Sequence, residues 1–135
     1  MEALLAVAEQ SADFCSELER SGARVFPVDV YTYGAVSDAA AVGRLIDSLV
    51  DGSIDVITFT SAPQVRTLFS AASESGLAKA LSDSLTERVV VAAIGEVTAQ
   101  ALSDHGVRVA IRPEVPRMGV MAQAIADHFA SDVGP

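Results

Sequence analysis

Residues 89–94 read Val-Val-Val-Ala-Ala-Ile, a run without a single polar side chain. A short run that is apolar at every position is typical of a strand covered on both faces, as in the centre of a parallel sheet. Three more stretches rich in β-branched and aromatic residues predict strands at 25–31, 54–60 and 107–111. The strand at 89–94 is therefore expected to be central in a sheet of four.

Segments with helical spacing of their apolar residues separate these strands. Pro63 marks the first turn of one helix, which Gly76 ends, and Gly106 ends another. The spacing of Leu4, Val7, Phe14 and Leu18 predicts that the sequence opens with a helix rather than with a strand. Regular alternation of helix and strand predicts an α/β fold, an open and mostly parallel sheet with flanking helices.

Composition narrows the class of protein. The chain has 135 residues, of which 50% are hydrophobic, enough for one domain with a buried core. A net charge of −9 disfavours binding to nucleic acid, and the apolar run at 89–94 is far too short to span a membrane. A single cysteine leaves no intramolecular disulfide and no cysteine-based metal cluster. These features, with no secretory signal at the start, predict a cytoplasmic protein.

The functional residues are expected at the carboxyl ends of the strands, where open α/β sheets bind their ligands. Two of these ends carry hydroxyl groups at a helix start: Ser61 follows the strand at 54–60, and Thr98 follows the strand at 89–94. Gly95 allows a ligand to approach the backbone there. Free amides beside hydroxyls can hold carboxylates. The alternative is that Ser61 and Thr98 only cap their helices.

Several enzyme classes lack their signatures. No glycine-rich phosphate loop follows a strand, and no aspartate ends a strand as a phosphoacceptor would. His105 precedes Gly106 at the predicted end of a helix, a common structural position for histidine. The sequence shows no Ser-His-Asp arrangement and no metal-ligand spacing. No metal or organic cofactor is therefore expected.

Four motifs together resemble the uroporphyrinogen-III synthase family. They are Gly-Ala-Arg-Val at 22–25, Val-Tyr at 30–31, Asp-Val-Ile-Thr-Phe-Thr-Ser at 55–61, and Ala-Ile-Gly at 93–95 followed by Thr-Ala at 98–99 and Ala-Leu at 101–102. Their order and spacing match the second half of that family across residues 18–129. Each motif is weak alone, and the combination is specific.

The resemblance implies a flavodoxin-like half of a two-domain synthase fold with the substrate in the cleft between domains. Members cyclise the linear tetrapyrrole hydroxymethylbilane to uroporphyrinogen III, with inversion of ring D, and use no cofactor. Position by position, Tyr31 matches a tyrosine that assists departure of the substrate hydroxyl. Ser61, Gly95 and Thr98 match residues that bind the substrate. Glu96 stands where the family commonly has proline, and so places a negative charge at a carboxylate-binding helix start.

The resemblance also suggests an organisation of the chain and an alternative role. Residues 1–33 are expected to form a helix, a strand and a crossing segment, residues 34–130 the main α/β unit, and residues 131–135 a tail. With no strand predicted before the first helix, exchange between two chains in a domain-swapped dimer is expected. Residues 116–120 resemble actinobacterial relatives that fuse a synthase-like module to a DNA-binding response regulator. The alternative function is therefore a non-catalytic ligand-binding or regulatory module.

Overall fold

Four parallel strands form the centre of the molecule in the computed structural model, which describes residues 2–6, 12–28 and 39–132. The strands are β1 (Glu2–Ala6), β2 (Arg24–Val28), β3 (Val56–Phe59) and β4 (Val90–Ala93). Their order across the sheet is β2-β1-β3-β4, and every neighbouring pair is parallel. This is the strand order of flavodoxin-like sheets, so the predicted fold class is confirmed.

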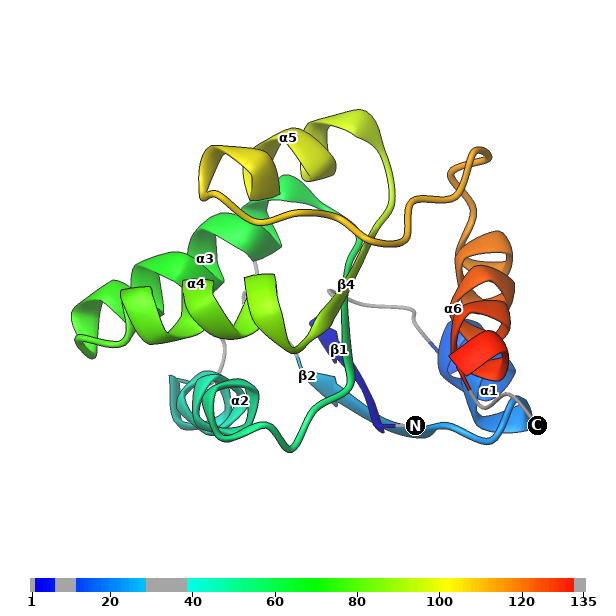
Figure 1. Cartoon of the computed structure of the whole chain (residues 1–135), viewed down its shortest axis with the longest axis horizontal. Coiled ribbons are helices and arrows are strands. Elements are labelled where there is room, and N and C mark those ends of the chain that lie inside the picture. Colours follow the sequence, from blue (N-terminus) through cyan, green and yellow to red (C-terminus); the bar gives the residue numbers. More distant parts are fainter. Residues whose placement is uncertain (1, 7–11, 29–38, 133–135) are drawn as a thin grey trace.

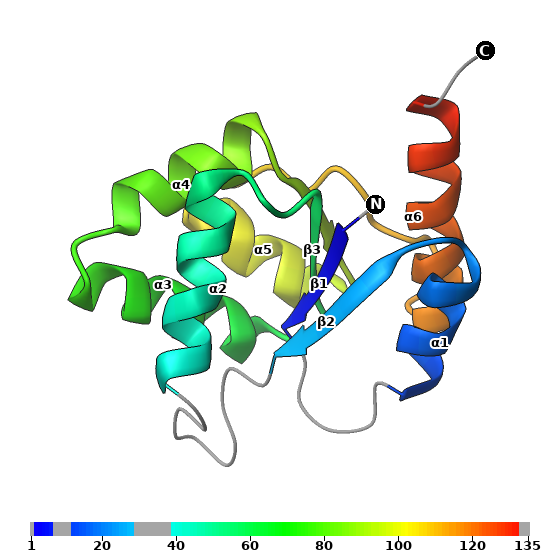
Figure 2. The ribbon, with the colours of Figure 1, turned by 90° about the horizontal axis from the view of Figure 1, so that it is seen from below.

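Helices cover both faces of this sheet (Figures 1 and 2). They are α1 (Ala12–Arg20), α2 (Ala39–Asp51), α3 (Ala62–Glu74), α4 (Ala78–Glu87), α5 (Glu96–Asp104) and α6 (Met118–Asp132). On one face α1 packs against α6, and on the other α2, α3, α4 and α5 pack against one another. Parallel strands need such crossover helices, and the helices in turn bury both faces of the sheet.

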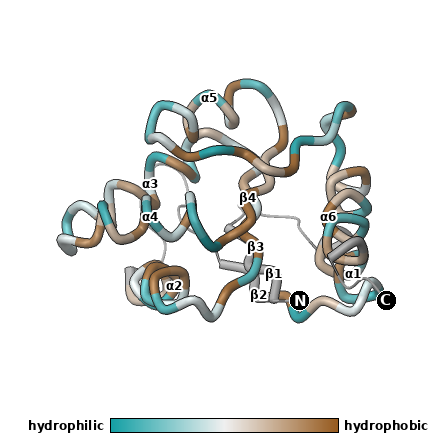
Figure 3. The backbone as a smooth tube through the Cα atoms, in the orientation of Figure 1, coloured by the Kyte–Doolittle hydropathy of each residue, from teal (hydrophilic) through white to brown (hydrophobic). Residues whose placement is uncertain are grey.

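The alternation of side chains along the strands divides the core into two clusters. Ile57 and Phe59 of β3 point into the cluster beneath α2 to α5, whereas Val56 points into the one beneath α1 and α6. All four residues of β3 are buried; three are hydrophobic, as the brown stretches of β3 in Figure 3 show, and the fourth is Thr58. Met121 is fully buried in the second cluster. Side chains of residues 89–94 alternate between the two clusters, so this strand is covered on both faces, as expected. Its expected central position is wrong, because β4 is the last of the four strands and only one bridge, to Ile111, lies beyond it.

The predicted opening helix is wrong. Residues Glu2–Ala6 form β1, and the helix starts only at Ala12. β1 lies between β2 and β3, with Leu4 in register with Phe26 on one side and Ile57 on the other. Residues 2–6 are too few for the spacing of their apolar side chains to distinguish a helix from a strand. Their conformation is therefore decided by pairing with the two neighbouring strands. The premise for a domain-swapped dimer, a missing first strand, is therefore removed.

The predicted strand at 107–111 is reduced to one bridge, between Ala92 and Ile111. The amides of Ala110 and Ile111 both donate to the Val91 carbonyl, so the regular ladder does not continue. Pro113, which has no amide hydrogen to offer, follows two residues later. The segment nevertheless runs parallel to β4 at the edge of the sheet.

The remaining boundaries agree with the sequence patterns within a few residues, a normal margin for helix and strand ends. Tyr31 lies outside the described residues. None of the helices in the described ranges combines the length and the apolar character that a membrane crossing demands.

Candidate functional site

The ends of β3 and β4 bring two helix starts to the same edge of the sheet. Phe59 and Ala93, the last residues of the two strands, are in register, and the Ile94 amide donates to the Phe59 carbonyl over 3.0 Å. Ser61 and Gly95 each stand two residues further on, before α3 and α5, and these two helices pack against each other. The sheet thus places the turns that contain Ser61 and Gly95 at neighbouring positions.

The turn before α3 is held by Gln64, which sequence analysis did not single out. The Gln64 side chain is fully buried, and its Oε1 accepts hydrogen bonds from the amides of Thr60 (2.8 Å) and Ser61 (3.3 Å). Its Nε2 donates to Thr60 Oγ1 over 3.2 Å. Three polar groups at the end of β3 are therefore fixed by one side chain.

Ser61 has extended backbone angles (φ −152°, ψ 152°) at the N-cap of α3. Its Oγ is buried and has no hydrogen-bond partner among the described residues. Ser61 and Gln64 have the arrangement of a capping box at the start of α3, yet no hydrogen bond to the Ser61 Oγ is formed within the described part of the chain. A buried hydroxyl without a partner costs about 1–3 kcal/mol, and such groups in native proteins call for an explanation such as a ligand.

The turn before α5 depends on Gly95. Its backbone angles (φ +88°, ψ 154°) lie in a region that side chains with a Cβ rarely adopt, and no atom lies within 4 Å of where a Cβ would stand. The first helical hydrogen bond runs from the Ala99 amide to the Gly95 carbonyl, so the amides of the preceding turn have no partner within the helix. Thr98, in that turn, is buried.

Glu96 and Arg112 face each other across the start of α5. Glu96 Oε1 lies 3.9 Å from Arg112 Nη2, and the two side chains are 89% and 47% exposed. Water weakens an ion pair with such exposed partners. The glutamate that the sequence places at this helix start is therefore loosely held by an arginine from the segment that follows the Ala92–Ile111 bridge.

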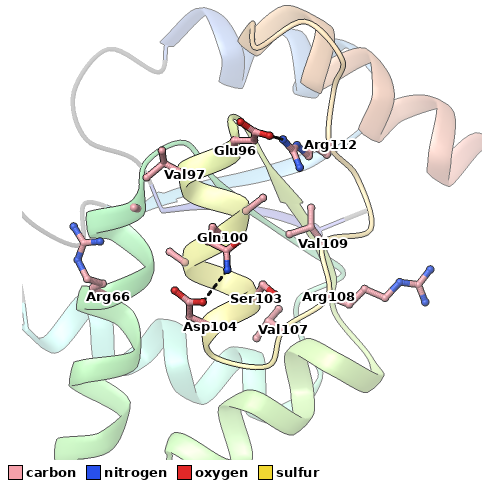
Figure 4. A pocket seen from close by; sticks show the side chains of 13 residues that line it. Arg66, Glu96, Val97, Gln100, Ser103, Asp104, Val107, Arg108, Val109 and Arg112 are labelled. Carbon is pink, nitrogen blue, oxygen red and sulfur yellow. Dashed lines mark hydrogen bonds and ion pairs between the residues drawn. The ribbon is translucent and has the colours of Figure 1, made fainter.

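Two cavities adjoin this ion pair, and Glu96 and Arg112 line both of them. The first, of about 760 Å³, borders α5 between α3 and residues 107–112 (Figure 4). The second is about 550 Å³. Its lining residues are Gly95, Glu96, Arg112, Pro113, Glu114 and Pro116. Of the predicted site residues that the structure describes, Gly95 lines the second of these two cavities, and Ser61 and Thr98 line neither of the two.

The described residues of this edge can bind an anion, and no paired acid and base is found among them. Among residues 2–6, 12–28 and 39–132 no group of three His, Cys, Asp or Glu side chains could hold a metal ion. His105 follows the last residue of α5 and stacks on Phe69, with ring centroids 4.1 Å apart. It has the structural position that the sequence predicted. Tyr31, the predicted catalytic residue, lies outside the described ranges, so its place relative to the edge stays a prediction.

Comparisons with known proteins agree with this architecture. The family model described as uroporphyrinogen-III synthase HemD matches residues 1–123. The YjjA protein of Bacillus subtilis is 34% identical over 121 residues, and a protein of Methanothermobacter thermautotrophicus that is provisionally named a uroporphyrinogen-III synthase is 39% identical over 116 residues. These matches cover 90% and 86% of this chain and 44% of each relative.

A solved structure extends the likeness to three dimensions. The crystal structure of uroporphyrinogen III synthase from Thermus thermophilus superposes with a TM-score of 0.64 at 30% sequence identity. The superposition covers 99% of this chain and 52% of the Thermus chain. The chain therefore spans about half the length of the relatives that it matches. The family model extends over nearly the whole sequence, and the chain belongs to the uroporphyrinogen-III synthase family.

Proposed function

We propose that the protein cyclises hydroxymethylbilane to uroporphyrinogen III, with inversion of ring D, in tetrapyrrole biosynthesis. The match of the family model to residues 1–123 carries this proposal. The carboxyl edge of the sheet supports it, because the turns at Ser61 and Gly95 offer a polycarboxylate several unpaired donors. Such a ligand can be held by backbone amides even though the chain has a net charge of −9.

The chemistry asks little of the protein beyond orientation. The substrate ionises by losing hydroxide, which leaves an azafulvenium cation, and ring closure then depends on how the flexible chain is folded. In this proposal Tyr31 assists departure of the hydroxide, while Ser61, Gly95 and Thr98 bind the substrate. No metal or organic cofactor takes part, and the reaction takes place in the cytoplasm.

Apolar side chains beside the second cavity support a tetrapyrrole rather than a small anion. Val115, between two residues that line this cavity, is 46% exposed, and Val97, which lines the adjoining first cavity, is 74% exposed. Exposed valines next to a polar edge can pack against the faces of pyrrole rings, while the donors of the edge take the carboxylates.

A coupled assay tests the proposal. The natural full-length chain is mixed with freshly generated hydroxymethylbilane, and uroporphyrinogen isomers I and III are separated. We expect isomer III to accumulate above the amount formed without protein. If isomer III does not rise, the enzymatic proposal is wrong.

The alternative is a non-catalytic module that keeps the fold and binds a ligand. The negative charge of Glu96 at the start of α5 favours it, since that charge opposes a carboxylate. This module would bind a tetrapyrrole without forming isomer III. Binding together with an inactive full-length chain would select the alternative.

A further inference from the structure

The position of Arg112 at the edge of the sheet is set by the backbone. Ile111 donates from its amide to the Val91 carbonyl over 3.1 Å, and its carbonyl accepts from the Ala93 amide over 2.9 Å. These two hydrogen bonds form the bridge between residue 111 and β4. Arg112 is the next residue, so its main chain is held beside the end of β4 and close to the turn at Gly95.

The Arg112 side chain lies where the two cavities meet. It lines both of them, and its Nη2 atom is 3.9 Å from Glu96 Oε1 (Figure 4). Charge-assisted hydrogen bonds are about 2.7–2.9 Å long, so this contact is an ion pair without a hydrogen bond. The Arg112 side chain is 47% exposed, so its guanidinium keeps donors available for another anion.

The positive charge of Arg112 decides whether the smaller cavity can bind an anion. Of the six residues that line this cavity, two are glutamates, Glu96 and Glu114, and Arg112 is the sole cation. An anion in the cavity would meet two negative side chains and one positive one. Without Arg112 it would meet the negative ones alone.

We infer that Arg112 binds a carboxylate of the substrate in the 550 Å³ cavity, and that Glu96 holds its guanidinium until the substrate arrives. This inference rests on the proposed function, which supplies a polycarboxylate ligand. A guanidinium forms two parallel hydrogen bonds with one carboxylate, so a well-placed ligand group outcompetes the loose contact to Glu96. Arg112 would thereby help to fix the orientation of the bound chain.

The other arginines near this edge serve as controls. Arg66 of α3 and Arg108 line the larger cavity and not the smaller one. Figure 4 shows the Arg108 side chain directed away from the Glu96–Arg112 pair. Arg108→Gln therefore changes the net charge as Arg112→Gln does, and leaves the smaller cavity intact.

The experiment is a titration of uroporphyrin III, the oxidised analogue of the product, into the natural full-length chain and its variants, followed by porphyrin fluorescence. We expect Arg112→Gln to weaken binding about tenfold, the usual range for losing a hydrogen bond to a charged group. Arg108→Gln should stay within about twofold of the wild type, since distant surface charges are screened. Arg112→Lys should lie between the two, because lysine keeps the charge and lacks the planar fork.

The double variant Glu96→Gln/Arg112→Gln separates direct contact from simple neutralisation of Glu96. Direct contact predicts that the double variant binds about tenfold more weakly than Glu96→Gln alone. Recovery of that affinity would show that Arg112 only compensates the glutamate, and would overturn the inference. Unchanged binding in Arg112→Gln would overturn it too, while the proposed function would stand. If the wild-type chain does not bind uroporphyrin III, both the proposed function and the inference about Arg112 are wrong.

Discussion

Gln64 is the residue on which the turn at Ser61 depends. Replacing it with leucine leaves the amides of Thr60 and Ser61 without their acceptor in a partly buried turn. Unpaired groups of this kind cost about 1–3 kcal/mol, so Gln64→Leu should lower the free energy of unfolding by about that amount. Urea unfolding followed by circular dichroism measures it.

Gln100→Leu is the matched control for this change. The Gln100 side chain also makes a hydrogen bond, from Nε2 to Asp104 Oδ1 over 2.9 Å, but it is exposed on α5. Water replaces that partner, so the free energy of unfolding should change by less than about 0.5 kcal/mol. Equal losses in the two variants would contradict the role given to Gln64.

Replacing Gly43 of α2 and Gly95 of the turn before α5 with alanine should change the free energy of unfolding in opposite directions. Gly95 has a φ of +88°, whereas Gly43 lies inside α2 with open space around it. Gly95→Ala forces a Cβ into a strained conformation and should cost about 1–3 kcal/mol of stability. Gly43→Ala should add about 0.5–1 kcal/mol, because alanine loses less backbone entropy in a helix. Urea midpoints compare the two, and a shared sign would contradict the conformation of Gly95.

The charge and the hydroxyl in the first turn of α5 should change ligand binding in opposite directions. Glu96→Gln removes a negative charge from the helix start and should tighten uroporphyrin III binding by about twofold to fivefold. Thr98→Ala should loosen it, because a proposed donor is lost. Fluorescence titration of the full-length chain measures both.

Asp104→Asn is the control for Glu96→Gln. It removes the same charge from the opposite end of α5 and should leave the affinity unchanged. If neither the Glu96 nor the Thr98 variant alters the affinity, the two residues act only in the structure of the helix.

For the whole molecule we expect one unfolding transition. Because β1 and β2 lie in the same sheet as β3 and β4, the two core clusters pack on opposite faces of one shared sheet. Ile125 of α6 is fully buried, so Ile125→Ala should destabilise the entire chain by about 2–5 kcal/mol. Val120, 39% exposed on the same helix, should change stability by less than about 0.5 kcal/mol when replaced with alanine.

Two probes can follow this transition separately. The chain has two tyrosines, Tyr31 and Tyr33, and no tryptophan, so tyrosine fluorescence reports on that segment and circular dichroism on the helices. Coincident midpoints, shifted equally by Ile125→Ala, indicate one cooperative unit. Separate midpoints would instead support residues 1–33 as a unit apart from residues 34–130.

Local sequence patterns were sufficient to predict the α/β class, the strand covered on both faces at 89–94, and the helix starts near Ser61 and Gly95. These features depend on neighbours in the chain: continuous apolar character, the alternation of periods, and glycine or hydroxyl residues at strand ends. Ser-x-x-Gln at 61–64 is also a local capping pattern, so the position of Gln64 could have been recognised.

The tertiary structure alone decided the conformation of residues 2–6, the loss of a regular strand at 107–111, and the meeting of Arg112 with Glu96. Residues 2–6 are a strand because two distant segments, β2 and β3, hydrogen-bond to them on either side. Residues 107–111 bridge β4 only at Ile111, and this bridge brings Arg112 to the start of α5. Each of these outcomes depends on pairing between residues far apart in the chain, which local propensity and periodicity do not contain.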